Sequence, residues 1–347
     1  MRSNRLPTVW ALLLATSAAF TQSPATATMH VNNVQAKFQA DGTLFNDGQQ
    51  GQFVPMEAGL AQKTLMRHSG IWMVGMDPGL NLKGSVSVNN RSNFQPGGLT
   101  QETPFIYDFN KIWKVSCADI QQHLAGYQDN GIVDNPDAAL FGFPSQGNSF
   151  FEQYNPGLPL PFTPQGLAGF YDSTQDATYD PDKGEYPSME VRGCALNRYP
   201  EEQSWFVFHD RAVHPSSLAP LNMEIQAQVF AYKTPQPSLL NNAVFVRYKL
   251  INRSDDLLDS CFVGIYSDFD IGNPDDDFID CIPDRQIMYG YNGDTNDEDG
   301  FGSSVPCNTN WMVVNFVIYE TNYFFFCNYT AALKCFLPYD LGEVRGL

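Results

Sequence analysis

Hydrophobic and polar residues alternate along several segments of the chain with the two-residue period of a β-strand. In Met223–Ala231, apolar residues occupy every second position, and Glu224, Gln226 and Gln228 lie between them. Because successive side chains of a strand point to opposite faces, one face of this segment is apolar and the other is polar. The same kind of pattern predicts further strands at 205–208, 242–251 and 261–271.

Turn residues and one helical pattern separate the predicted strands. Asp77-Pro78-Gly79 lies between Ile71–Gly75 and Leu82–Val88, which predicts a hairpin because Pro presets one turn dihedral angle and Gly tolerates the positive one. Ser116 to Asp119 fits a helix-capping box, and apolar residues follow at helical spacing, so we expect one short helix over 117–127.

The order of these elements predicts a fold class. Strands recur with turns between them, and residues 130–187, rich in Gly, Pro, Asn and Asp with interspersed aromatics, form a long excursion that we expect to be ordered. This indicates a mainly β protein: an antiparallel, jelly-roll-like β-sandwich with one short helix and long loops.

The N-terminus has the features of a secretory signal peptide over residues 1–27. Two arginines precede an apolar stretch, and Ala25-Thr26-Ala27 is a small-residue cleavage site. We therefore expect export through the Sec pathway, a mature chain that starts at Thr28, and a location outside the cell or on its surface.

The rest of the chain is divided by composition. We distinguish an N-terminal β region over 28–165, an acidic β region over 166–306 that packs with the first as one unit, and a divergent hydrophobic tail over 307–347. The most apolar segment of the tail, Trp311–Phe326, is interrupted by polar residues and is shorter than the ~18–20 apolar residues of a membrane span, so no transmembrane helix is expected.

Net charge limits the partners. The 347 residues carry a formal charge of −18, and residues 172–347 hold 27 acidic against 11 basic side chains. A chain this acidic does not hold nucleic acid or anionic lipid by electrostatics, whereas divalent cations are natural partners.

The densest acidic stretch, Tyr266–Gly302, contains eleven acidic residues and one base, Arg285. Within it Asp268 and Asp270 share one face of a predicted strand, and neighbouring loops add further carboxylates. Hard oxygen ligands of this kind suit Ca²⁺, although an acidic surface bathed in water is the alternative. The candidate ligands in this stretch are Asp268, Asp270, Asp275, Asp276, Asp277 and Asp294.

A second candidate calcium loop begins at Asp172. Oxygen-bearing side chains fall at relative positions 1, 3, 5, 7 and 9, the spacing of an EF-hand-type loop. Position 6, which favours Gly, is Ala177, and position 12 is Lys183, so Asp182 or Glu185 would have to close the site; a plain polar turn is the alternative. The candidate ligands here are Asp172, Thr174, Asp176, Thr178, Asp180 and Asp182.

Catalytic motifs are not evident. No H-E-x-x-H, G-x-S-x-G or P-loop sequence occurs. The adjacent His209 and Asp210 could act as a catalytic pair, but a histidine with a structural role is far commoner. We expect calcium to be structural and the protein to be non-catalytic. Two alternatives stay open: a secreted hydrolase that uses paired carboxylates on glycans, and a glycan-binding module marked by an exposed aromatic strip without paired acids.

The seven cysteines are not spaced as metal or redox motifs. In an oxidising compartment some could pair, and Cys261 with Cys281 would bracket the acidic loop; buried free thiols are the alternative.

A family resemblance is carried, in order along the chain, by segments 31–38, 71–75, 111–115, 172–187, 222–231, 242–254 and 268–281. Together they resemble a large family of secreted Bacteroidota proteins of poorly defined function, whose better-known members end in a type IX secretion sorting domain. The resemblance implies an exported surface or extracellular protein, and it does not imply an enzyme. This chain departs from the family at Ala177 and Asp280, where members tend to have Gly, and no sorting domain is evident in the tail. Besides divalent cations, glycans and other surface proteins are the partners that we consider for such a protein.

Overall fold

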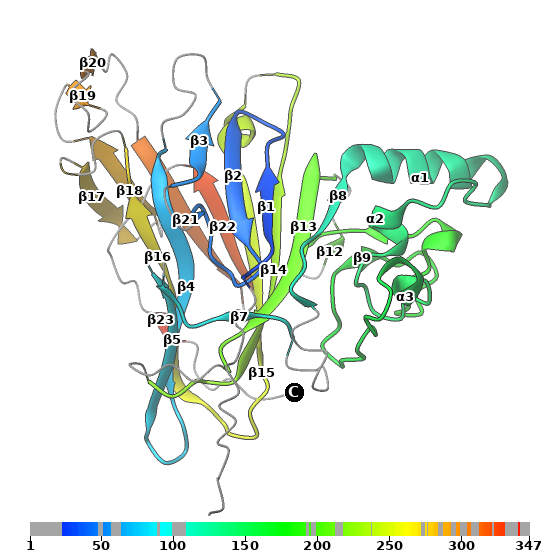
Figure 1. The fold of residues 1–347 in the computed structure, drawn as a ribbon, viewed down its shortest axis with the longest axis horizontal. Coiled ribbons are helices and arrows are strands. Elements are labelled where there is room, and N and C mark those ends of the chain that lie inside the picture. The colour runs from blue at the N-terminus through cyan, green and yellow to red at the C-terminus, as the bar shows by residue number, and fades with distance from the viewer. Residues whose placement is uncertain are drawn as a thin grey trace, which may run out of the picture.

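Two antiparallel β-sheets pack face to face in the computed structural model, and a lobe of short helices and loops lies beside the second sheet (Figure 1). This confirms the predicted mainly β, sandwich-like fold. The structure describes residues 23–47, 51–56, 64–88, 91–98, 109–191, 194–195, 199–211, 218–236, 238–271, 275, 277–283, 287–292, 296–298, 304–306, 312–320, 323–329 and 339–340.

The first sheet is built around β4, which pairs with β5 on one side and with β16 on the other. The β4–β5 pair is the hairpin that the sequence predicts. The described strands of this sheet are β1 (Thr26–Met29), β2 (Val34–Gln39), β3 (Phe53–Pro55), β4 (Met66–Met76), β16 (Asp259–Phe269) and β23 (Tyr339–Asp340), with β5 (Leu82–Val88) and β6 (Arg91–Ser92) beside β4.

The second sheet carries β13, β14 and β15 next to one another, and its far edge is β17. Two strands of the sequence-defined tail, β21 and β22, lie between β18 and β15. The described strands of this sheet are, in spatial order, β17 (Asp277–Ile282), β18 (Ile287–Asn292), β21 (Met312–Glu320), β22 (Tyr323–Tyr329), β15 (Val244–Asn252), β14 (Met223–Ala231), β13 (Glu202–His209) and β7 (Gln95–Pro96), with β8 (Trp113–Ser116) also paired to β13.

Three further strand pairs are short. They are β9 (Phe170–Tyr171) with β10 (Tyr186–Pro187), β11 (Glu190–Val191) with β12 (Cys194–Ala195), and β19 (Asn296–Glu298) with β20 (Ser304–Pro306).

The main core lies between the two sheets and follows the predicted alternation. Ile225, Ala227 and Val229 of β14 are buried there together with Phe206 and Phe208 of β13. Fully burying a side chain such as Phe stabilises the fold by about 1.5–3 kcal/mol. Because a one-residue slip would exchange the two faces of each strand, this apolar face sets the register and also decides which polar residues face outward.

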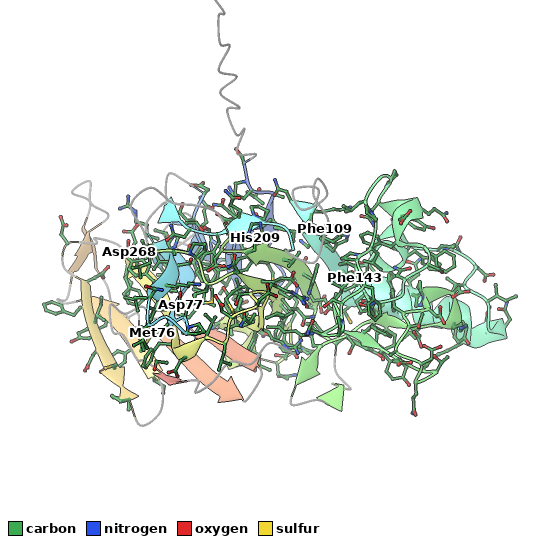
Figure 2. All side chains as sticks on the ribbon, turned by 90° about the horizontal axis from the view of Figure 1, so that it is seen from below. Met76, Asp77, Phe109, Phe143, His209 and Asp268 are labelled. Carbon is green, nitrogen blue, oxygen red and sulfur yellow. The ribbon has the colours of Figure 1, made fainter. Side chains whose placement is uncertain are left out.

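A second core lies under the lobe, on the outer face of β13. Trp205 and Val207, which alternate with the residues of the main core, pack against aromatic residues of the lobe such as Phe109 and Phe143. Figure 2 shows Phe109 and Phe143 on the lobe side of the molecule and Asp268 toward the opposite end. The predicted excursion is therefore a packed layer over one face of the second sheet.

The lobe contains the helix that the sequence predicts. α1 (Cys117–Asn130) begins at a capping box in which the Asp119 N–H donates to Ser116 Oγ and the Ser116 N–H donates to Asp119 Oδ2. It runs three residues further than predicted and ends at Gly131, whose φ is 78°. Two one-turn helices follow, α2 (Ala138–Phe141) and α3 (Phe151–Tyr154).

The N-terminal residues of the described chain are part of the fold. Thr26 and Ala27 lie in β1, paired with Gln39 and Phe38 of β2. The N–H of Ala25 donates to Asn110 Oδ1 at 2.6 Å. A chain that starts at Thr28 lacks half of β1. Most of the expected signal peptide, residues 1–22, lies outside the described residues.

The described helices include none that is long and apolar enough to cross a membrane. Cys261 and Cys281 are not joined by a disulfide bond in the structure, so the pairing that would bracket the acidic loop is not formed.

Candidate functional site

The acidic loop that follows β9 is wrapped around the carboxylate of Asp172. Asp172 Oδ1 accepts the N–H of Gln175 at 2.6 Å, and Oδ2 accepts the N–H of Ala177 at 2.9 Å. Desolvation raises the pKa of Asp172, but the N–H donors from Ala177, Gln175 and Asp176 lower it by more, so the net shift is downward. The carboxylate of Asp176 accepts the N–H of Thr178 at 2.8 Å.

Glu185 closes this loop. Its side chain is fully buried; Oε1 accepts the N–H of Ser173 at 2.8 Å, and Oε2 accepts the N–H of Asp180 at 2.9 Å. Asp182, the other residue considered for this position, is exposed on the 3₁₀ turn Pro181–Lys183. Asp180 forms an ion pair with Lys183.

The loop has a coiled backbone that ordinary residues rarely adopt. Gln175 and Ala177 have φ values of 59° and 61°, in the left-handed region that favours Gly. Ala177 stands where an EF-hand-type coil favours Gly, and its backbone adopts the left-handed conformation that Gly allows. The hydroxyl of Thr174 donates to Asp172 Oδ1 at 3.3 Å.

The second acidic group lies at the end of β16. Phe269 and Ile271 are buried in the main core, while Asp268 and Asp270 alternate with them and are only partly buried, as the sequence predicts. Burial raises the pKa of Asp270 to about 6; the positive charge of Arg67 lowers it and the negative charge of Asp268 raises it. Asp270 is thus a carboxyl group that pays a desolvation cost when it ionises.

Asp277 closes the loop that leads into β17. Its Oδ2 accepts the N–H of Ile271 at 2.9 Å, and Asp275 is exposed. Asp276 and Asp294 lie outside the described residues. Within the part of the chain that the structure describes, no group of three or more His, Cys, Asp or Glu side chains is arranged to hold a metal ion. At the loop after β9, calcium binding would therefore require Asp172 to release the backbone N–H groups that it now accepts. At the end of β16 it would require the same of Asp277.

The adjacent His209 and Asp210 are engaged separately. Asp210 Oδ1 accepts the N–H of Met223 at 2.7 Å, and Oδ2 accepts the N–H of Leu221 at 2.8 Å and the hydroxyl of Ser85 at 3.0 Å. His209 Nδ1 accepts the N–H of Arg211, and burial lowers the pKa of His209 to about 4. The aspartate thus connects β14 of one sheet to β5 of the other, which is a structural role.

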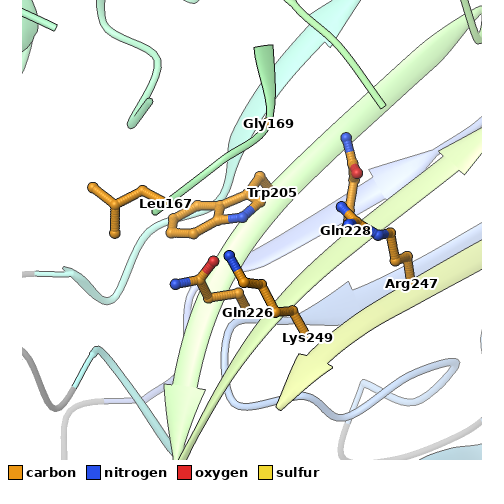
Figure 3. Close-up of a pocket in the computed structure, with 7 residues that line it drawn as sticks. All are labelled: Leu167, Gly169, Trp205, Gln226, Gln228, Arg247 and Lys249. Atoms are coloured by element: carbon orange, nitrogen blue, oxygen red, sulfur yellow. The ribbon is translucent and has the colours of Figure 1, made fainter. Parts of the chain in front are cut away.

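A small cleft that no sequence pattern predicts lies on the outer face of the second sheet, beneath the lobe (Figure 3). Its volume is ≈ 30 Å³, and segment 167–169 of the lobe forms one wall. Strand register places Trp205, Gln228 and Arg247 side by side across β13, β14 and β15, and places Gln226 beside Lys249 in the next row.

Hydrogen bonds fix the orientation of the two glutamine amides in this cleft. Gln203 Nε2 donates to the carbonyl of Pro187 at 2.9 Å, so its Oε1 is left to accept Gln228 Nε2 at 2.8 Å. Gln226 Nε2 donates to the carbonyl of Gly166 at 3.1 Å. The amide oxygens of Gln226 and Gln228 have no hydrogen-bond partner among the described atoms, although these residues are only 3% and 4% exposed. Buried acceptors of this kind are costly unless a donor reaches them.

The cleft is lined by positive charge, although the protein as a whole is acidic. Arg247 and Lys249 are the charged residues that line it, and the Lys249 ammonium donates to the carbonyl of Gln165. The nearby carboxylate of Glu224 is matched by Arg253 at 2.8 Å. The cleft therefore combines two positive charges with two amide oxygens that can accept hydrogen bonds, and these lie beside the Trp205 ring. Such a site suits a group that is both anionic and hydroxylated.

A second surface feature is an aromatic strip at the edge of the same sheet, formed by Phe278 of β17 with Tyr289 and Tyr291 of β18. Phe278 and Tyr291 are 56% and 38% exposed, and their rings stack at 6.0 Å with an interplanar angle of 22°. The Tyr289 ring lies 5.9 Å from that of Tyr291, and its hydroxyl donates to Asp280 Oδ2 at 2.8 Å.

Sequence patterns contain part of the signal for these features. The alternation in β14 predicts that Gln226 and Gln228 share a face, and Arg247 and Lys249 alternate in the same way in β15. Only the pairing of three strands and the position of the lobe bring these residues together. Comparison of the chain with protein-family models, with curated proteins and with solved structures finds no match.

Proposed function

We propose that the protein is an exported, calcium-stabilised, non-catalytic β-sandwich with an adhesive role at the cell surface or outside the cell, and that it holds glycans on the aromatic strip. The observation that carries this proposal is the exposure of Phe278 and Tyr291 as a stacked pair. Solvated aromatic clusters mark interaction sites, and the C–H face of a sugar ring packs on an aromatic ring while its hydroxyls remain available for hydrogen bonds. Asp280, beside the strip, offers an acceptor for such a hydroxyl.

The chemistry of the cleft favours binding over hydrolysis. A glycosidase needs two carboxyl groups roughly 5–10 Å apart across the scissile bond. The residues that line this cleft are amides, cations and apolar groups. The buried carboxylate of Asp210 accepts hydrogen bonds from two backbone N–H groups and a hydroxyl, which gives it a structural role.

Calcium, in this proposal, stabilises the edge of the sheet that carries the strip. The loop between Ile271 and Asp277 leads directly into β17, and Asp268 and Asp270 lie at its start. A divalent cation bound there would relieve the repulsion between these two carboxylates and would anchor the strand that bears Phe278. An ion that binds only the folded state contributes about 3 kcal/mol at a hundredfold excess over its Kd.

The adhesive role is tested with a double substitution in the strip, Phe278→Ala with Tyr291→Ala. Binding of the purified protein to a panel of immobilised polysaccharides should fall by roughly tenfold or more, since each ring contributes about 0.5–1.5 kcal/mol beyond its burial. Phe162→Ala is the matched control, because Phe162 is a lobe residue that is 78% exposed. Equal binding by the double variant and the control would refute the glycan-binding role of the strip.

The calcium component is tested by thermal unfolding. EDTA should lower the midpoint of unfolding, and excess Ca²⁺ should restore it. Asp268→Asn should reduce this response, while Asp134→Asn, on the lobe, should leave it intact. Identical midpoints in EDTA and in Ca²⁺, together with the absence of metal from the purified protein, would refute it.

A further inference from the structure

We infer that the cleft beneath the lobe is a specific receptor for an acidic sugar, in which the cations hold the carboxylate of a uronic acid residue and the glutamine oxygens accept its hydroxyls. This inference rests on the proposed function in naming a class of glycan. It concerns a different surface, so the two can fail separately.

Hydrogen bonds fix the direction of the two glutamine amides. Gln203 donates to the carbonyl of Pro187 and accepts the amide N–H of Gln228. These two hydrogen bonds set the orientation of the Gln228 amide, so its oxygen remains available as an acceptor. The oxygen of Gln226 is left in the same way by the hydrogen bond to Gly166. Two acceptors buried without donors require a partner that carries hydroxyl or N–H groups.

The cleft also carries positive charge. A neutral hydroxylated ligand would satisfy the amides but would not use the guanidinium of Arg247 or the ammonium of Lys249, which line the same cleft. A simple anion would use the cations but would leave the amide oxygens unmatched. A hydroxylated carboxylate satisfies both, and charge-assisted hydrogen bonds of this type are the stronger ones.

The size of the cleft limits how much of a sugar can enter it. Figure 3 shows the indole of Trp205 beside Gln226 and Lys249, with Gln228 and Arg247 further along the strands. A bound water needs roughly 10–15 Å³ of such space, so a cleft of ≈ 30 Å³ takes about two oxygen atoms. The cleft therefore accepts one edge of a sugar, with a carboxylate oxygen toward the cations and a hydroxyl toward the glutamine oxygens, and the rest of the ring stays at the mouth near Trp205.

The test uses D-galacturonate as the probe, with D-galactose as its neutral counterpart and acetate as an anion without hydroxyls. Each is titrated into the full chain at low salt and followed by calorimetry and by Trp fluorescence. We expect galacturonate to bind with a Kd on the order of 1 mM, at least about tenfold more tightly than either control. Equal binding of acetate, equal binding of galactose, or no binding of galacturonate would overturn the inference, the last of these leaving ordered waters as the occupants.

Variants connect the binding to this cleft. Lys249→Met should weaken galacturonate binding by about tenfold or more, because it removes one charge-assisted contact. Lys233→Met, which changes an exposed lysine just beyond β14, is the matched control and should have no effect. Gln228→Glu tests the site without relying on lysine, since it replaces the neutral amide by a carboxylate that repels the carboxylate of the ligand, and it should abolish binding. Circular dichroism and the unfolding midpoint establish that each variant is folded, and unchanged binding in folded Lys249→Met would overturn the assignment.

The strip variants separate this inference from the proposed function. If Phe278→Ala with Tyr291→Ala binds polysaccharides as well as the Phe162→Ala control does, but galacturonate still binds the cleft, the proposed role of the strip falls and the cleft assignment stands. If the double variant loses polysaccharide binding, but galacturonate does not bind the unsubstituted chain, the strip stands and the cleft assignment falls.

Discussion

Replacing Ala177 by Gly should stabilise the protein, contrary to the usual effect of introducing Gly. Ala177 has a φ of 61°, where the Cβ of an L-residue is crowded against its own backbone. Occupying this region costs a non-glycine residue about 1–2 kcal/mol. The N–H of Ala177 donates to Asp172 Oδ2 at 2.9 Å, so the surrounding loop holds the residue in this conformation.

The magnitude follows from two opposing effects. Glycine relieves the native strain of about 1–2 kcal/mol, but it gives the unfolded chain more freedom, which costs about 0.4–1 kcal/mol. The expected net gain in the free energy of unfolding is about 1 kcal/mol, or about 2 °C in the unfolding midpoint for a protein of this size. Ala177 is exposed, so no packing is lost.

The assay is urea unfolding in EDTA, which separates the backbone effect from any effect of calcium. The matched control is Ala125→Gly, at an exposed position within α1, where the same substitution should cost about 0.5–1 kcal/mol. The two variants should therefore move in opposite directions. If Ala177→Gly destabilises the protein as much as Ala125→Gly does, the left-handed conformation of this loop is wrong.

Three further outcomes are expected. Glu185→Ala should lower the free energy of unfolding by about 2–4 kcal/mol, since a buried carboxylate that accepts three backbone N–H groups is lost; a loss below about 0.5 kcal/mol would contradict its closing role. In calcium-free buffer, protonated Asp270 should add to the free energy of unfolding. This contribution should be fully present below pH 3.8, the ordinary pKa of Asp, and should be lost as the pH rises through the folded pKa of about 6. Asp270→Asn should therefore flatten the dependence of the free energy of unfolding on pH between these values, and an unchanged dependence would be evidence against a raised pKa. N-terminal sequencing of exported protein should find a start at or before Ser23, because Ser23 and Ala25 hydrogen-bond to Asn110; a start at Thr28 would count against the packing of β1.

Local patterns were sufficient for the elements. The alternation in β14 and β16, the capping box at Ser116 and the turn at Asp77–Gly79 each depend on residues close together in the chain, and each is present in the structure. Such patterns encode which face of a strand is apolar and where a helix begins, because side-chain periodicity and capping are local properties of the backbone.

The sequence did not predict which partners the acidic side chains face. The acidic residues of the loop after β9 have the spacing of ion ligands, yet Asp172 and Glu185 accept backbone N–H groups in the structure. Spacing alone cannot distinguish a carboxylate that holds an ion from one that holds its own loop, because both need the same alternation and differ only in which donor comes within reach.

By itself, then, the sequence determined the mainly β class, the apolar faces of β14 and β16 and the acidic character of the later half. The tertiary structure alone decided that Trp205, Gln228 and Arg247 lie in one row under the lobe, that His209 and Asp210 are engaged separately, and that Phe278 and Tyr291 stack at an exposed edge. Each of these depends on strand register and on contacts between segments distant in the chain. Such contacts arise only when several apolar faces are buried together, so no single segment contains them.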